Sequence, residues 1–350
     1  MNPAFPSLKD LTTDNITDNV HLVNSQCPDP RLRYLVHRVV THLHDFARET
    51  RLSTEEWVAG VQFLTQIGQI SNELRHEMIL LSDTLGLSML VDAINHPRMP
   101  PATEGTVLGP FHTHDAEEME HGAVLHHDPE ATRLLVVGSV KDTKGNPIPD
   151  VKIDVWEGDS KGFYDVQNPN RTGPDGRGVL HSDSNGAFHF KAIVPVPYPI
   201  PMDGPVGKML SALGRHPNRP GHVHFMMEKP GYDLLITWDA ALRPFLHSPW
   251  EYMTDDSSAL YPRGDPYETS DPVFGVKESL MIDFSTVTDP EMAARYDAPL
   301  GMHLLTHDFV LLTEAEAREL RKNKAIEAME KQSRNVVFIK DLPVPAEWLV

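Results

Sequence analysis

The histidines at positions 222 and 224 are the strongest sign of metal chemistry in the chain. Alternate residues of a strand point to the same face, so a His-x-His pair on a strand can direct both imidazoles at one ion. In GHVHFMMEKPGY, apolar residues alternate with His222 and His224. This alternation predicts one face against the core and both histidines on the other face. By itself the pair leaves a second interpretation open, that of two buried histidines without a metal.

A second His-x-His pair, His112 and His114, has a different context. It lies in HTHDAEEMEHGAVLHHD, an acidic stretch that shows no strand alternation. We therefore interpret this pair as solvated surface, where any metal binding would be adventitious.

Two imidazoles need further ligands, and tyrosines in rigid contexts are the candidates. The chain has one cysteine and no H-E-x-x-H motif, which argues against a cysteine cluster and against a zinc protease of that class. Tyr164 lies in KGFYD, and Tyr198 lies in VPVPYPIP, where prolines restrict its backbone. An anionic phenolate is a hard ligand suited to iron(III). The alternative for Tyr198 is simple packing against its prolines.

The N-terminal part of the chain is predicted to be helical. Asp29 and Pro30 supply an N-cap and a first-turn proline for an amphipathic helix. Ser53 and Glu56 form a capping box that opens a second helix. A third helix is expected from about Asn72 to Asn95, before the prolines of HPRMPP.

From about residue 106 the pattern changes to short strands separated by Gly/Pro turns, which is typical of an antiparallel sandwich. Strands are expected at residues 133–141, 151–156, 186–194, 221–228 and 233–237. A charged helix at 313–334 and a strand at 336–340 follow. The predicted fold class is α+β, with a helical domain at 1–105 and a β-sandwich at 106–350.

The chain resembles the intradiol ring-cleavage dioxygenases from about residue 20 to about residue 310. The first matching block covers residues 136–164, from Val-x-Gly-x-Val through Ile-Asp-Val to Gly-x-Tyr. The second is PYPIP at 197–201, and the third is RPGHVHF at 219–225. Three blocks in the family's order are far more specific than a lone His-x-His pair.

This resemblance implies one non-haem iron(III) ion, Fe(3+), per subunit. Tyr164 and His222 would be its equatorial ligands, and Tyr198 and His224 its axial ligands, with hydroxide completing the resting centre. A diol would chelate the metal as a dianion and displace Tyr198, which accepts a proton. Arg219 would stabilise the negative charge that develops on the ring carbon. The implied reaction is cleavage by O₂ between two hydroxyl-bearing ring carbons.

The resemblance also gives each domain a role. Residues 1–105 would be a linker domain through which related enzymes form homodimers, and which can hold a phospholipid in an apolar tunnel. Residues 106–350 would be the catalytic domain.

The candidate substrate pocket resembles that of the hydroxyquinol 1,2-dioxygenase branch more than that of the catechol branch. Its residues are Leu80, Asp83, Val107, Leu108, Gly109, Pro110, Phe111, Ile200, Pro201 and Val273, together with Arg219. A carboxylate at Asp83 could accept a hydrogen bond from a third ring hydroxyl, and would be unfavourable beside an unsubstituted ring edge. The alternative for Asp83 is a helix-end residue in Ser-Asp-Thr.

The predicted substrate is therefore hydroxyquinol (benzene-1,2,4-triol), which would give 3-hydroxy-cis,cis-muconate or its tautomer maleylacetate. The nearest alternative is cleavage of catechol or a chlorocatechol to cis,cis-muconates. Two alternatives come from other classes, a zinc hydrolase that uses the histidine pair and a non-enzymatic sandwich that binds a carrier-type ligand. Both predict a colourless protein without iron.

Residues Trp238 to Ser258 depart from the family pattern. Without these 21 residues, Thr237 would join Ala259 in one continuous strand, LLIT-ALYPR. Our hypothesis is a retained intron or a gene-model error, and the alternative is a genuine loop over the pocket mouth. Sequencing the transcript separates the two.

Composition sets the remaining limits. The 350 residues include 31 basic and 50 acidic side chains, a formal charge of −19, which argues against nucleic-acid or anionic-membrane partners. The single cysteine, Cys27, excludes an internal disulfide framework. We see no signal-peptide pattern and no apolar run of membrane-spanning length, so a cytoplasmic location is expected.

Overall fold

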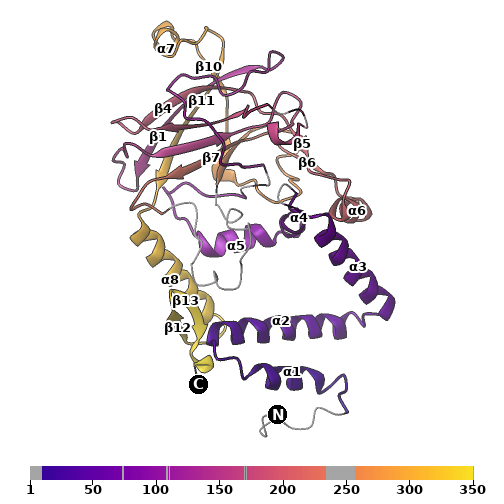
Figure 1. Ribbon diagram of the computed structural model, residues 1–350. Helices are drawn as coiled ribbons and strands as arrows, with labels where there is room; N and C mark the ends of the chain where they lie inside the picture. The colour runs from indigo at the N-terminus through magenta and orange to yellow at the C-terminus, as the bar shows by residue number, and fades with distance from the viewer. Residues whose placement is uncertain are drawn as a thin grey trace. The chain divides into compact units, whose positions relative to one another are not determined.

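The computed structural model describes residues 10–72, 75–107, 109, 111–168, 170, 172–233 and 257–349. The chain forms two compact units (Figure 1). The larger comprises Gln66–Leu320, and the smaller combines Met1–Thr65 with Arg321–Val350.

Two sheets form the centre of the larger unit, where most of the labelled strands in Figure 1 gather. The first has the order β10-β11-β1-β4, with β10 at Ser285–Thr286, β11 at His303–Leu311, β1 at Arg133–Asp142 and β4 at Ala187–Ile193. The second has the order β3-β2-β7-β8-β9, with β3 at Arg177–His181, β2 at Lys152–Trp156, β7 at Val223–Glu228, β8 at Ser258–Pro262 and β9 at Met281–Ile282. A separate short pair joins β5 (Tyr198–Pro199) to β6 (Asn218–Arg219).

The hydrophobic core lies between these two sheets. It combines apolar side chains from β1, β4 and β11 with others from β2, β3, β7 and β8. Val223, Phe225 and Met227 of β7 belong to this core, whereas Met226 lies in a second cluster with Trp156, Tyr164 and Tyr198. The predicted alternation of β7 is therefore confirmed, and it places His224 on the face of the five-stranded sheet that points away from the core.

The predicted α+β fold with N-terminal helices and a sheet-rich C-terminal part is confirmed. Most pairings are antiparallel, but β1 pairs with β11 and β8 pairs with β9 in parallel. Of the expected strand at 233–237, only Asp233 falls within the described residues. Residues 238–256 of the segment that departs from the family pattern also lie outside them, and β8 begins at Ser258.

The predicted single helix at 72–95 is wrong, because the chain forms two shorter helices there. α4 covers Glu77–Thr84 and α5 covers Leu87–Asn95. Between them Gly86 adopts a positive φ of 73°, a conformation that glycine tolerates and that stops a helix. The larger unit also contains α6 (Pro205–Ala212) and α7 (Pro290–Arg295).

Three helices begin in the smaller unit, and the second and third of them have the caps that the sequence predicts. α1 covers Ile16–Asn24, α2 covers Pro30–Glu49, and α3, at Thr54–Ile70, begins in this unit. The Asp29 side chain accepts a hydrogen bond from the Leu32 amide, and Ser53 and Glu56 exchange capping bonds. α8 (Glu314–Glu330) ends in this unit and leads to a hairpin of β12 (Val336–Ile339) and β13 (Leu342–Pro345). No helix in the described ranges is long and apolar enough to cross a membrane.

Candidate metal centre

His222 and His224 direct their Nε2 atoms at each other on the outer face of the five-stranded sheet. The two nitrogens lie 2.9 Å apart. The Nδ1 atom of His222 lies 2.9 Å from the Pro220 carbonyl oxygen, an acceptor, so this nitrogen carries the ring hydrogen. The Nδ1 atom of His224 lies 3.4 Å from the Ser257 hydroxyl, which itself donates to the Val107 carbonyl. The same tautomer follows for His224.

These tautomers leave two nitrogen lone pairs pointing at one place. Without a cation, two lone pairs at 2.9 Å repel each other. Burial lowers the pKa of His222 to about 3, with a further contribution from the positive Arg219, so a proton does not resolve the conflict near neutral pH. Burial likewise lowers the pKa of His224 well below its ordinary value. A metal ion bound by both nitrogens does resolve it.

Tyr164 and Tyr198 complete the same cluster. Both are buried, and their ring centroids lie 5.4 Å apart at an interplanar angle of 80°. The Tyr198 ring lies 5.5 Å from the His222 ring. Burial and the neighbouring Tyr198 raise the pKa of Tyr164 well above its usual value, so its phenolate requires a strong local positive charge. Two neutral imidazoles and two such phenols form a hard, mixed O/N donor set that fits iron(III).

Strand pairing brings segments that are distant in the sequence together at this cluster. Tyr198 on β5 pairs directly with Arg219 on β6, and Trp156 on β2 pairs with His224 on β7. The Trp156 and His224 rings are stacked at 4.6 Å and 8°. Gly162 lets the segment that carries Tyr164 approach Tyr198, because a Cβ there would lie 2.7 Å from the Tyr198 Cβ.

We expect Gly162→Ala to destabilise the fold. Gly162 has a φ of +82°, and the added methyl group would also collide with the backbone next to Tyr198. Strain and overpacking of this kind cost about 2–4 kcal/mol in the free energy of unfolding. Urea denaturation measures the effect, and Gly145→Ala is the matched control, because Gly145 has a φ of +83° but a Cβ there meets nothing within 4 Å. An equal stability for both variants would contradict this account of the tyrosine approach.

Arg219 is buried in the same cluster and forms several hydrogen bonds. Its Nη1 atom donates to the Tyr198 hydroxyl at 3.1 Å and lies 3.5 Å from Nε2 of His222. Its Nη2 atom donates to the Tyr261 hydroxyl at 3.2 Å, and its Nε and Nη2 atoms both donate to Asp271. The guanidinium therefore presents positive charge at the side of the cluster occupied by Tyr198 and His222.

The interpretation of His112 as solvated surface is wrong. Only 3% of its side chain is exposed, and its Nε2 atom lies 3.1 Å from the Asp154 carboxylate. Its ring packs edge-on against Trp156, with centroids 4.7 Å apart, behind the tryptophan that stacks on His224. His114 is exposed, as expected. The local pattern around His112 could not reveal this burial because both partners come from β2.

The described candidate pocket residues occupy two regions around the cluster. Near the histidines and Tyr164, Val107 is buried, a Cβ on Gly109 would lie 3.9 Å from Nε2 of His224, and Phe111 stacks on Tyr164 at 4.6 Å. Ile200 is buried and Pro201 half-buried after Tyr198. Leu108 and Pro110 lie outside the described residues.

The second region is made of α4 and the turn at 271–275. Leu80 and Asp83 on α4 and Val273 in the turn are buried. Arg215 joins the two, since it donates to the Thr84 carbonyl and to the Pro272 carbonyl at 2.7 Å each. Burial raises the pKa of Asp83 to about 6, whereas hydrogen bonding to Ser88 and the charge of Arg219 act against that rise. Asp83 therefore lies within the electrostatic influence of Arg219.

Sequence reasoning missed several residues of the cluster. Trp156, Tyr261, Asp271 and Ser257 contact the candidate ligands or Arg219, and Thr106 contacts Tyr261. Tyr261 and Asp271 lie beyond the segment that departs from the family pattern, and no local motif marks them. For Trp156, the alternation of residues along the predicted strand could have signalled its place in the cluster, because Trp156 lies opposite His224 on the neighbouring strand.

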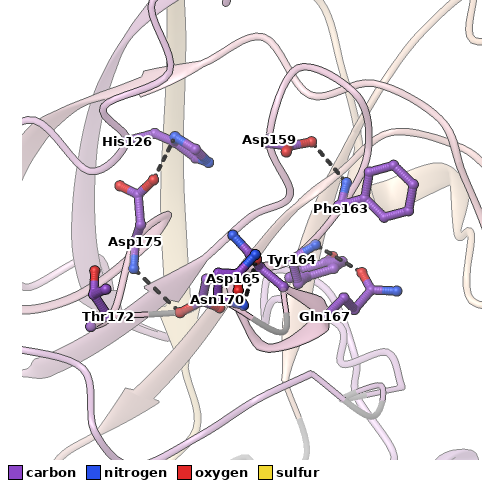
Figure 2. Close-up of a pocket in the computed structure, with 11 residues that line it drawn as sticks. His126, Asp159, Phe163, Tyr164, Asp165, Gln167, Asn170, Thr172 and Asp175 are labelled. Carbon is purple, nitrogen blue, oxygen red and sulfur yellow. Dashed lines mark hydrogen bonds and ion pairs between the residues drawn. The ribbon is translucent and has the colours of Figure 1, made fainter.

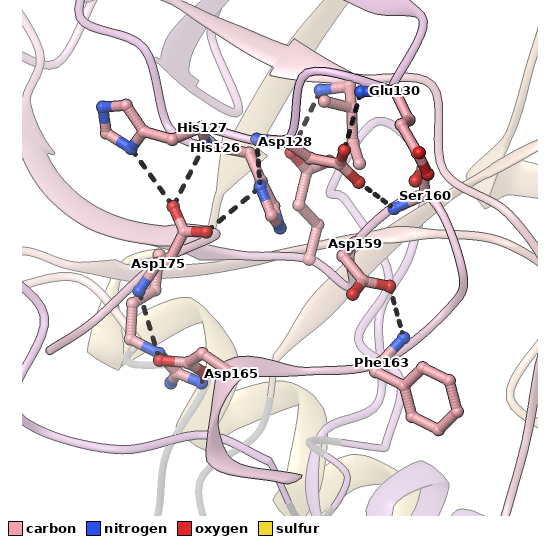
Figure 3. Close-up of polar contacts among 12 residues, drawn as sticks. His126, His127, Asp128, Glu130, Asp159, Ser160, Phe163, Asp165 and Asp175 are labelled. Atoms are coloured by element: carbon pink, nitrogen blue, oxygen red, sulfur yellow. Dashed lines mark hydrogen bonds and ion pairs between the residues drawn. The ribbon is translucent and has the colours of Figure 1, made fainter. Parts of the chain in front are cut away.

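A second pocket, of about 420 Å³, is lined by Tyr164 and by residues that are not part of the cluster (Figure 2). Its carboxylates already have partners: Asp159 accepts from the Phe163 amide at 2.9 Å, and Asp165 accepts from the Asp175 amide at 3.3 Å. Figure 3 shows that Asp175 also contacts His126 and His127, at 3.3 and 3.2 Å. These contacts hold the segment that carries Tyr164, so we interpret the network as structural.

Within the described residues, no group of three or more His, Cys, Asp or Glu side chains is arranged to hold a metal ion. A centre built from two histidines therefore depends on the tyrosines.

Comparison with known proteins gives a consistent family. The family model for the catechol dioxygenase N terminus matches residues 29–103, and the dioxygenase model matches residues 107–239. An intradiol ring-cleavage dioxygenase of Aspergillus niger is 57% identical over 348 residues, 99% of each chain. A hydroxyquinol 1,2-dioxygenase of a Rhizobium species is 43% identical over 288 residues, 81% of this chain and 90% of the relative. The structure of hydroxyquinol 1,2-dioxygenase from Pseudomonas putida matches with a TM-score of 0.75 and 38% identity, over 86% of this chain and 99% of that one.

Proposed function

Because the chain belongs to the intradiol ring-cleavage dioxygenases, we propose that it cleaves hydroxyquinol with O₂ to 3-hydroxy-cis,cis-muconate, the tautomer of maleylacetate. The family implies non-haem iron and a substrate that reacts with O₂. The observation that carries the proposal is the convergence of His222 and His224, with Nε2 atoms 2.9 Å apart, beside two buried tyrosines and Arg219. Both oxygen atoms of O₂ enter the product, since C₆H₆O₃ and O₂ give C₆H₆O₅.

The proposed metal is one iron(III) ion per subunit, held by Tyr164, Tyr198, His222 and His224. When bound, iron(III) supplies Lewis acidity that activates a chelating diol toward O₂. The protein's own contribution begins with the histidine tautomers, since both Nδ1–H groups donate outward and keep each Nε2 free to ligate.

Tyr198 is the proposed base for substrate binding. Burial raises the pKa of Tyr198, and the charge of Arg219 and its hydrogen bond to the Tyr198 hydroxyl at 3.1 Å act against that rise. When a diol arrives, the phenolate oxygen can take one of its two protons. The proton then remains on Tyr198 next to Arg219, whose positive guanidinium stabilises the negative charge that develops on the ring.

The third hydroxyl of hydroxyquinol is assigned to Asp83. The other proposed pocket residues are Leu80, Val107, Leu108, Gly109, Pro110, Phe111, Ile200, Pro201 and Val273, with Arg219. Asp83 is 4% exposed on α4 and has a hydrogen bond with Ser88, and a third ring hydroxyl would give its buried carboxylate a further donor. Catechol and chlorocatechols, the alternative substrates, lack this donor.

Asp83→Asn is expected to lower the ratio of kcat/KM for hydroxyquinol to kcat/KM for catechol by about 10- to 100-fold, the range for losing a hydrogen bond to a charged group. Because burial raises the pKa of Asp83 to about 6, the wild-type ratio should rise as the pH increases from 5 to 7, while the carboxylate ionises. The ratio in the Asn variant should stay flat over that range. An unchanged ratio at pH 7 would show that Asp83 does not determine the preference for hydroxyquinol over catechol.

Product analysis tests the function itself. The purified, iron-loaded protein should consume hydroxyquinol and O₂ in equal amounts, and label from ¹⁸O₂ should enter the open-chain product at two positions. Parallel assays with catechol and 4-chlorocatechol rank the alternatives. Faster turnover of catechol than of hydroxyquinol would replace the proposed substrate, and no ring opening of any of the three would reject the function.

Residues 1–105 are proposed as the linker domain of a homodimer, and residues 106–350 as the catalytic domain with an atypical segment at 238–258. Support comes from large apolar side chains exposed along α2 and α3, which are Leu35, Val39, Leu43, Phe46, Trp57, Val61 and Leu64. Contiguous apolar surface of this kind marks interaction sites. The same surface supports a bound phospholipid at the dimer interface. A cytoplasmic location is part of the proposal and agrees with the single cysteine.

A further inference from the structure

We propose that Asp271 is a positioning residue that fixes the orientation of the Arg219 guanidinium and thereby sets the rate of ring cleavage. The inference rests on the proposed function, since Arg219 is its proposed charge-stabilising group. Asp271 lies 52 residues after Arg219 in the chain and belongs to none of the three family blocks.

The contact between the two side chains is bidentate. The Nε atom of Arg219 donates to Oδ1 of Asp271 at 3.1 Å, and its Nη2 atom donates to Oδ2 at 3.2 Å. The two side chains are 2% and 3% exposed, so solvent does not weaken the pair. Two parallel bonds to one carboxylate fix both the plane and the rotation of a guanidinium.

The bidentate contact with Asp271 determines where the Nη1 atom of Arg219 points. With Nε and Nη2 held by Asp271, Nη1 is the nitrogen that faces the candidate ligands, where it donates to Tyr198 at 3.1 Å and approaches His222 at 3.5 Å. A rotation of the guanidinium would move Nη1 away from both residues. Among the described residues, Asp271 forms no hydrogen bond with Tyr198 or His222, so it can orient the Nη1 atom only through Arg219.

The turn that carries Asp271 is held in place as well. The Val273 amide donates to Oδ1 at 3.3 Å, and the Gly275 amide donates to Oδ2 at 3.0 Å. Gly275 has no room for a side chain, because a Cβ there would lie 2.8 Å from Nη2 of Arg219. Backbone amides of the same turn therefore hold the Asp271 carboxylate in the position from which it orients the Arg219 guanidinium.

The pair also balances charge. A buried guanidinium without a counter-charge is strongly unfavourable, and the negative Asp271 compensates it. The nearby Tyr261 hydroxyl accepts a bond from Nη2 at 3.2 Å but carries no charge to replace the carboxylate.

The test uses the full-length, iron-loaded protein and the variant Asp271→Asn. An amide keeps the size of the carboxylate but presents an N–H₂ group to one of the two guanidinium donors, so the bidentate contact is lost. We expect kcat for hydroxyquinol to fall about 30- to 100-fold, the effect of misplacing a positioned group by about 1 Å. KM and the iron content should stay within about twofold of the wild-type values, and a crystal structure should show the guanidinium rotated.

Asp271→Glu is the second variant, because it keeps the charge but moves the carboxylate. It should also lower kcat, and it replaces Asp271→Asn as the test if the amide variant does not fold.

Asp233→Asn is the matched control. Asp233 forms a second buried pair, with Arg98 at 2.8 Å, and those side chains are 3% and 4% exposed. Both asparagine variants therefore lose a buried carboxylate, but only position 271 contacts Arg219. A double variant Asp271→Asn with Arg219→Lys should be no slower than Arg219→Lys alone, because both changes act on one guanidinium.

The outcomes separate this inference from the proposed function. An active wild-type enzyme with unchanged kcat in both position-271 variants overturns the role of Asp271 and leaves the function intact. Additive losses in the double variant also overturn it. If the wild-type protein shows no ring cleavage, the proposed function is wrong. The crystal structures still test the role of Asp271, because an unrotated Arg219 guanidinium in Asp271→Asn would show that Asp271 does not orient it.

Discussion

Tyr164→Phe is expected to produce a protein that folds but binds iron at least about 100-fold more weakly, since removal of even an outer-shell partner of a metal ligand costs about 10- to 100-fold. The change removes one hydroxyl and keeps the ring, which stacks on Phe111 at 4.6 Å, so the packing of the loop is preserved. Ring cleavage should fall with the iron content. The measurement is iron per subunit after dialysis against a graded series of chelator concentrations.

Tyr261→Phe is the matched control for this change. Tyr261 is also fully buried in the site, and its ring lies 5.2 Å from the His222 ring, but we do not assign it as a ligand. It should therefore retain iron. Equal iron affinity in the two variants, or a greater loss in Tyr261→Phe, would show that the ligand set is wrong.

Arg219→Lys is expected to lower kcat by about 100- to 1000-fold, the usual effect of losing one group that stabilises charge in the transition state. Lysine keeps the positive charge but lacks the planar fork, so it cannot hold Asp271 with two bonds and reach Tyr198 at the same time. Alanine is less informative, because it would leave the buried Asp271 carboxylate without its counter-charge.

Iron content and substrate affinity separate a catalytic effect of Arg219 from a structural one. Arg219 is not a proposed ligand, so Arg219→Lys should keep its iron, and KM for hydroxyquinol should change far less than kcat. A kcat within threefold of the wild-type value would contradict the assigned role. Loss of iron in parallel with loss of rate would mean that Arg219 acts by supporting the ligands.

Local patterns predicted those parts of the site that depend on one segment at a time. Alternation along residues 222–227 placed both histidines opposite the core, and β7 has that arrangement. The proline-rich context of Tyr198 predicted a restricted backbone but not the short strand in which Tyr198 pairs directly with Arg219. Capping residues likewise gave the starts of two N-terminal helices.

Features that depend on distant partners escaped prediction. His112 is buried because Asp154 and Trp156 of β2 pack against it, and nothing within its own acidic segment signals those contacts. Asp271 and Tyr261 reach Arg219 only through the pairing of β8 with β7 and the turn that follows.

The helix break at Gly86 escaped prediction for a different reason. Hydrophobic spacing continues across the break, so periodicity alone extended one helix to Asn95.

The visible spectrum of the purified protein, recorded with metal analysis, tests the central claim most directly. The tyrosine–histidine centre predicts about one iron per subunit and a red-brown tyrosinate-to-iron(III) charge-transfer band. The band should shift when hydroxyquinol is added without oxygen, because a bound diol would change the ligands of the iron that the two tyrosines and two histidines would hold. A colourless protein that stays iron-free after reconstitution with iron would contradict the account, because the four side chains would then not form a metal centre.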